Sequence, residues 1–148
     1  MNSRGAGRTS STGRTGGFPR ASGGGGFGGT PRGQEGGRKV STVTTHVLDT
    51  SLGRPAAGVP IRLERLPSGE PVAEGVTDDD GRVRGLGPDD LPPGTYRVVF
   101  GTGAYFARSG QRTFYPEAAV TFLVEEAGGH YHVPLVLSPF AYSTYRGS

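Results

Sequence analysis

Short runs of alternating apolar and polar residues, separated by turns rich in glycine and proline, follow one another along the chain after residue 39. Alternation with a period of two residues is typical of a β-strand with one buried face. In VPIRLERL, for example, Val59, Ile61 and Leu63 fall on one face and the intervening charged residues on the other. The pattern predicts strands at residues 40–49, 59–66, 71–77, 95–100, 118–124, 130–138 and 142–146.

The segment TGAYFARSGQ (102–111) is the one stretch that fits a helix. Thr102 is expected to cap its start and Gly110 to end it, while Tyr105 and Phe106 are expected to anchor it. About seven short strands at regular spacing, with so little helix, favour an all-β fold. The predicted architecture is a two-sheet antiparallel β-sandwich.

Residues 1–39 have a different composition from the rest of the chain. They hold 14 of the 28 glycines, seven basic residues, one acid and almost no apolar side chains. Such a segment buries too little surface to offset the entropy lost on ordering, so we expect a disordered tail. Residues 40–148, with nine arginines and twelve acids, form the expected folded domain. The basic charge therefore belongs to the tail, and no specific nucleic-acid partner is predicted.

Several classes of protein are excluded by what the sequence lacks. It contains no cysteine, which excludes disulfides, thiolate nucleophiles and cysteine-ligated metals. It has no run of about 18 apolar residues, so no membrane-spanning helix is expected. The N-terminal residues lack the apolar centre of a secretory signal. The cytoplasm is therefore the expected location.

The three histidines, His46, His130 and His132, lie in predicted strands. His130 and His132 are two residues apart and therefore share one face of a strand, opposite the apolar face that begins at Tyr131. A His-x-His pair with a third histidine fits an open zinc site. Two neutral imidazoles also fit general acid–base catalysis near neutral pH. Surface histidines without a function are the third interpretation, and the spacing alone leaves all three open.

Arg82 follows the acidic turn TDDDG (77–81). The acids suggest a calcium loop, but the glutamate that the D-x-D-x-D-G-x5-E pattern requires is missing. A tight turn at Asp80 and Gly81 explains the motif without a metal. The guanidinium of Arg82 is then either solvated or a planar donor for an anionic, carbonyl-rich ligand.

The chain also contains the segments THVLDTSLGRPAAGVPIRLERL, TDDDGR, GTYRVVF, FYPE and HYHVPLVLSPFAYSTYRGS. Together they resemble the 5-hydroxyisourate hydrolase family, the transthyretin-related enzymes of urate breakdown. The resemblance spans residues 40–148, and the terminal YRGS is highly specific. Transthyretin, the hormone carrier, shares the fold but lacks the histidines and the terminal tetrapeptide, so the resemblance favours the enzyme.

This resemblance implies a transthyretin-like sandwich that assembles as a homotetramer, a dimer of dimers with active sites between subunits. The implied reaction is hydrolysis of 5-hydroxyisourate, a flat bicyclic product of urate oxidation, to 2-oxo-4-hydroxy-4-carboxy-5-ureidoimidazoline. Water would attack a cyclic amide and open the six-membered ring. No cofactor and no metal are implied.

The resemblance also implies which residues line the site. His46, Arg82 and His132 match the catalytic positions, and His130 is not carried over as catalytic. One of the two matching histidines would act as the base on water, and the other would orient the water or donate a proton. Arg82 would hold the substrate and stabilise the oxyanion. Substrate binding is implied for His46, Arg82, Tyr145, Arg146, Gly147 and Ser148.

Two non-catalytic alternatives remain at this point. Residues 52–100 also resemble prealbumin-type accessory modules, which serve as binding or spacer domains. A transthyretin-like carrier of a small ligand is the other possibility. The accessory module leaves the histidines and the terminal tetrapeptide without a role, and enzymatic turnover separates the enzyme from both.

Overall fold

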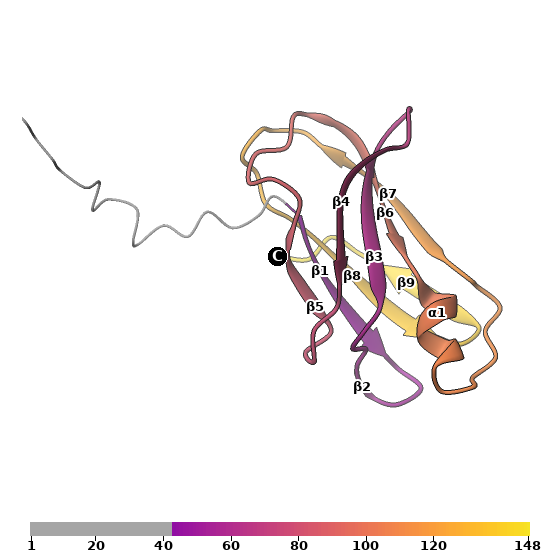
Figure 1. Ribbon diagram of the computed structural model, residues 1–148. Coiled ribbons are helices and arrows are strands. Elements are labelled where there is room, and N and C mark those ends of the chain that lie inside the picture. Colours follow the sequence, from indigo (N-terminus) through magenta and orange to yellow (C-terminus); the bar gives the residue numbers. More distant parts are fainter. Residues whose placement is uncertain (1–42) are drawn as a thin grey trace, which may run out of the picture. The chain divides into compact units, whose positions relative to one another are not determined.

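The computed structural model describes residues 43–148, which form two β-sheets packed face to face (Figure 1). The predicted disordered tail, residues 1–39, lies outside the described residues. Within residues 43–148 no helix is long and apolar enough to cross a membrane. The elements are β1 (Val43–Asp49), β2 (Arg54–Pro55), β3 (Pro60–Arg65), β4 (Glu70–Val76), β5 (Arg82–Leu86), β6 (Gly94–Phe100), α1 (Thr102–Ala107), β7 (Ala118–Val124), β8 (Tyr131–Ser138) and β9 (Ala141–Thr144).

One sheet has the strand order β4-β3-β6-β7, and all its neighbours are antiparallel. The other has the order β2-β1-β8-β9, with β5 paired to the same edge of β1 as β2. In this second sheet β1 and β8 run parallel, which places Thr44 beside His132 and His46 beside Pro134. The predicted β-sandwich is confirmed, and this parallel pair is the one departure from antiparallel order among the described strands.

The core lies between the inner faces of the two sheets. From the second sheet it receives alternate residues of β1 and β8, such as Val47 and Leu135, both fully buried. From the first sheet it receives Tyr96 and Phe100 of β6, also fully buried. The predicted apolar face of β8 is confirmed, because the odd-numbered residues from Tyr131 to Leu137 are all buried. The even-numbered residues of β1 and β8 therefore face outward.

Helix α1 begins where predicted but is shorter, ending at Ala107 instead of residue 111. The predicted cap is wrong. Gly101 occupies the N-cap position without a side-chain hydrogen bond, and the Thr102 hydroxyl donates to the carbonyl of Tyr115 at 2.7 Å. Phe106 fixes the helix by inserting into the core with 2% of its surface exposed. Gly110 lies three residues beyond the helix end, with a positive φ of 68°.

Two strand boundaries matter for the site. Strand β5 was not among the predicted strands, yet it carries Arg82 at its first position. The last strand ends at Thr144 instead of residue 146. Beyond it, Gly147 forms an isolated antiparallel bridge with His132. The chain end thus leaves β9 and contacts β8.

Candidate active site

The three residues predicted to be catalytic lie on adjacent strands of one sheet face. His46 on β1 is directly opposite Arg82 on β5. Thr44, two residues before His46 on the same face of β1, is directly opposite His132 on β8. His46, Arg82 and His132 are all half-buried. The outward face of β5, β1 and β8 therefore gathers two imidazoles and a guanidinium from three strands.

His46 is held in its uncharged form. Burial, which disfavours the protonated ring, lowers the pKa of His46 below the ordinary value of 6.5, and the positive charge of Arg82 lowers it further. A hydrogen bond to the Asp80 backbone and the carboxylates of Asp78 and Asp80 act in the opposite direction without overcoming these effects. The ring is thus mainly neutral at pH 7 and can accept a proton.

His132 is held neutral by the same physical causes. Burial lowers its pKa below 6.5, and Arg82, His130 and His46 add to the effect, against a hydrogen bond to the Thr44 backbone. The Thr44 hydroxyl lies 2.8 Å from Nδ1 of His132 and also 3.0 Å from Nε2 of His130. The rings of His130 and His132 are stacked, with centroids 6.4 Å apart. The sequence-based prediction that these two histidines share one face is confirmed.

The terminal tetrapeptide reaches this face through its glycine. The Gly147 N–H donates to the His132 carbonyl at 2.9 Å. A Cβ at position 147 would overlap Cδ2 of the His132 ring, so only glycine fits there without displacing the ring. Gly147 therefore closes one side of the His132 imidazole.

The other three residues of the tetrapeptide are exposed in the single chain. The Arg146 guanidinium lies over the ring of Tyr131, 5.0 Å from its centroid, and Tyr131 belongs to the opposite face of β8 from His132. Tyr145 has 58% of its surface exposed. Both line a hollow between the edges of the two sheets, together with Phe122 of β7 and His132 of β8. Within one chain, Tyr145 and Arg146 thus lie at the sandwich edge.

The model of the HIUase/Transthyretin family matches residues 43–147. The chain belongs to this family. Curated relatives include the 5-hydroxyisourate hydrolase of Salmonella dublin, 45% identical over 109 residues that cover 72% of this chain and 80% of the relative. The 5-hydroxyisourate hydrolase of Mus musculus is 44% identical over 113 residues, which cover 73% of this chain and 96% of the relative.

Solved structures of the family have the same fold. The 5-hydroxyisourate hydrolase of Klebsiella pneumoniae superposes with a TM-score of 0.67 at 42% identity, covering 73% of this chain and all of that one. Transthyretin from Sparus aurata superposes with a TM-score of 0.66 at 35% identity, covering 72% of this chain and 96% of that one. The 5-hydroxyisourate hydrolase and the transthyretin thus superpose on this chain almost equally well, so the fold alone does not distinguish them.

The described residues offer no set of ligands for zinc or for calcium, the two metals that the sequence suggested. Within residues 43–148 no three His, Cys, Asp or Glu side chains are grouped so that they could hold a metal ion. The Asp78 carboxylate, which the calcium interpretation would require as a ligand, instead accepts the backbone N–H groups of Asp80 and Arg82 at 2.9 and 3.0 Å. These bonds stabilise the turn that introduces β5.

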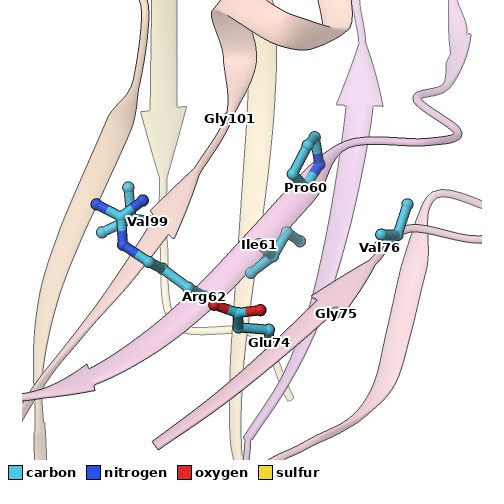
Figure 2. A pocket seen from close by; sticks show the side chains of 8 residues that line it. All are labelled: Pro60, Ile61, Arg62, Glu74, Gly75, Val76, Val99 and Gly101. Carbon is cyan, nitrogen blue, oxygen red and sulfur yellow. The ribbon is translucent and has the colours of Figure 1, made fainter. Parts of the chain in front are cut away.

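A second hollow lies on the other sheet, over β3 and β4 (Figure 2). Its lining includes Arg62, and no histidine contributes to it. The Arg62 guanidinium is already paired with Glu64 at 2.6 Å and with Glu117 at 3.7 Å. This hollow therefore offers no acid–base pair and no free guanidinium, unlike the outward face of β5, β1 and β8.

Sequence reasoning missed Thr44, the residue that joins His130 to His132. One signal was present, because Thr44 lies two residues before His46 and must share its face. The information that was missing is the parallel register of β1 and β8, which alone brings Thr44 beside His132.

Proposed function

We propose that the chain hydrolyses 5-hydroxyisourate to 2-oxo-4-hydroxy-4-carboxy-5-ureidoimidazoline in urate degradation, and that His46, Arg82 and His132 are its catalytic residues. The observation that carries the proposal is the placement of two neutral imidazoles beside a guanidinium on one sheet face. Relatives of this chain at 43–45% identity are named 5-hydroxyisourate hydrolase. The transthyretins among the solved structures are only 34–35% identical, which favours the hydrolase.

The chemistry requires a base, because water is a poor nucleophile at neutral pH. A neutral imidazole removes one proton from water while the water oxygen attacks the carbonyl carbon of the cyclic amide. The carbon–nitrogen bond then breaks, and the imidazolium returns the proton to the leaving nitrogen. The imidazole ends the cycle neutral, and the second hydrogen of the water stays on the new carboxyl group, which then ionises in solvent. The second imidazole orients the water or the substrate.

Arg82 supplies the positive charge that this reaction needs. It holds the flat, carbonyl-rich substrate and stabilises the negative charge that develops on the attacked carbonyl oxygen. Removing one such donor typically slows an enzyme by about 10²–10³-fold. Burial is the largest cause of the lowered pKa of His46 and His132, and the charge of Arg82 adds to it, so the same side chain helps to keep the bases unprotonated.

The proposal includes a homotetramer, a dimer of dimers in which Tyr145, Arg146, Gly147 and Ser148 contribute to substrate sites between subunits. The exposure of large apolar side chains supports it, including Phe114 at 71%, Phe140 at 63% and Tyr145 at 58%. Such surface is commonly covered by a partner. Light scattering after gel filtration tests this assembly, and a monomer would contradict it.

We also propose that residues 40–148 are the catalytic domain, that residues 1–39 are an attached tail, and that the protein resides in the cytoplasm. Turnover by a protein that lacks residues 1–39 tests the first two statements. Cell fractionation tests the third.

The function itself is tested by mixing the purified chain with urate and urate oxidase and following the decay of the 5-hydroxyisourate absorbance. The expected result is a decay that accelerates in proportion to the amount of chain added, equally with and without a chelator. A decay that stays at the spontaneous rate would favour a non-catalytic carrier or accessory module. Turnover that is lost with the chelator would contradict the metal-free mechanism.

A further inference from the structure

The hydroxyl of Thr44 contacts nitrogen atoms of two different imidazoles. Its Oγ1 lies 2.8 Å from Nδ1 of His132 and 3.0 Å from Nε2 of His130, both within hydrogen-bond range. Thr44 is buried, with 9% of its surface exposed, whereas His130 is exposed. The three side chains therefore form a hydrogen-bonded series from the exposed His130 to the half-buried His132.

The number of donor hydrogens on the hydroxyl and the two imidazoles limits how these hydrogen bonds can be arranged. A hydroxyl donates one hydrogen bond and accepts up to two, and a neutral imidazole has one donor and one acceptor nitrogen. If the Thr44 hydroxyl donates to His130, Nδ1 of His132 must donate to Thr44, and the lone pair of His132 is on Nε2. If the hydroxyl donates to His132 instead, the His132 proton is on Nε2. The partner of the hydroxyl proton thus selects the His132 tautomer.

Two features favour a proton on Nδ1 of His132. A hydrogen bond to the Thr44 backbone stabilises a proton on this ring, and Nδ1 is the nitrogen that faces Thr44. Arg82 and His46 contribute only positive or neutral groups around the ring, and a nearby cation favours a lone pair over an N–H. Because Nδ1 is occupied by the Thr44 hydroxyl, Nε2 is the ring nitrogen left for a substrate or water.

We propose that Thr44 and His130 are positioning residues that keep the proton of neutral His132 on Nδ1, so that Nε2 of His132 accepts the proton of the attacking water. This assignment rests on the proposed hydrolysis for its functional meaning. It makes His132 the base and leaves the orienting role to His46. When Nε2 gains its proton, the Nδ1–H donor becomes charge-assisted, which stabilises the imidazolium.

The tautomer is measured directly from the ¹⁵N chemical shifts of the His132 ring in the free, full-length protein. The wild type is expected to show a protonated Nδ1 and an unprotonated Nε2. In Thr44→Val, which keeps the shape of the side chain without its hydroxyl, we expect the shifts to move toward the Nε2–H form. Thr44→Ser is expected to restore the wild-type shifts. His130→Phe keeps a stacked ring without an acceptor and is expected to behave like Thr44→Val.

The same variants are assayed for turnover. We expect kcat to fall roughly tenfold to a hundredfold in Thr44→Val and His130→Phe, part of the 10²–10⁴-fold that a general base contributes. KM should change little, and Thr44→Ser should recover most of kcat. A merely structural role for Thr44 would leave the tautomer of His132 unchanged.

Failure of the proposed hydrolysis can be told apart from failure of the positioning role of Thr44 and His130, because the ¹⁵N shifts are measured without substrate. A wild type with no turnover would overturn the proposed function, whatever the shifts are. A wild type that turns over but carries the His132 proton on Nε2 would overturn the role of Thr44 and His130. Shifts that are unaltered in both Thr44→Val and His130→Phe would overturn it equally.

Discussion

Gly147 lies directly against the imidazole of His132. Its N–H donates to the His132 carbonyl at 2.9 Å, and a Cβ at residue 147 would overlap the ring. The contact joins the end of the chain to β8 and fixes one side of a proposed catalytic residue. A small displacement of a catalytic group by about 1 Å can cost on the order of 10²-fold in rate.

Gly147→Ala should therefore reduce kcat by roughly tenfold or more by displacing the His132 ring. The melting temperature should fall by no more than a few degrees, because residue 147 lies outside the core between the sheets. Steady-state kinetics and thermal unfolding measure the two effects. Wild-type kcat in a folded Gly147→Ala protein would show that the contact does not position His132.

Removal of residues 145–148 should also impair turnover while the sandwich stays folded. The last strand, β9, ends at Thr144, so the deletion removes the Gly147 contact and leaves all described strands intact. We expect kcat/KM to fall by at least about tenfold. Circular dichroism of the truncated protein should match the full-length chain, and full activity would contradict a role for the tetrapeptide.

The pH dependence of kcat/KM should reflect the lowered pKa values of His46 and His132. Both rings are unprotonated and active above these values, so the rate should fall only when the pH drops clearly below 6.5. Stability should change in the same direction. Between the folded pKa and 6.5 the unfolded chain binds more protons, so stability decreases as the pH falls through this window. A kcat/KM midpoint above 6.5 would contradict the neutral environment described for these rings.

Tyr105→Phe tests the packing of α1 at a distance from the proposed site. The Tyr105 hydroxyl donates to Oδ2 of Asp49 at 2.6 Å, and Asp49 has only 2% of its surface exposed. Burial and the Asp49 carboxylate raise the pKa of Tyr105 to about 12. Losing this hydrogen bond to a charged group should cost about 1.5–3 kcal/mol in denaturant unfolding. A stability equal to the wild type would show that the bond contributes nothing net.

The sequence was sufficient for the class of fold because alternation reports directly which face of a strand is buried. It also placed His130 and His132 on one face, since that depends only on their spacing, although β8 begins at Tyr131 and His130 lies just before it. It missed β5, whose five residues RVRGL include a glycine and two arginines that dilute the strand pattern. It extended the last strand into residues whose backbone only bridges His132 once.

The contacts between strands were beyond the sequence because they depend on register. The parallel pairing of β1 with β8 brings Thr44 to His132, although 88 residues separate them. The sequence also could not predict where the Arg146 side chain lies. Its guanidinium lies over Tyr131, a residue that the alternation correctly assigned to the inner face, and this position at the sandwich edge follows only from the three-dimensional path of the chain end.

The central claim is that the outward face of β5, β1 and β8 hydrolyses 5-hydroxyisourate, with Arg82 as its cation. Arg84 is a matched control, because it lies two residues further along β5, is exposed, and pairs only loosely with Asp78 and Asp80 at 3.9 and 3.6 Å. The most direct measurement is kcat/KM of Arg82→Gln and Arg84→Gln beside the wild type. Arg82→Gln should lose about 10²–10³-fold, and Arg84→Gln should stay within about twofold, since exposed ion pairs contribute little. Equal kcat/KM values for both variants and the wild type would contradict the claim.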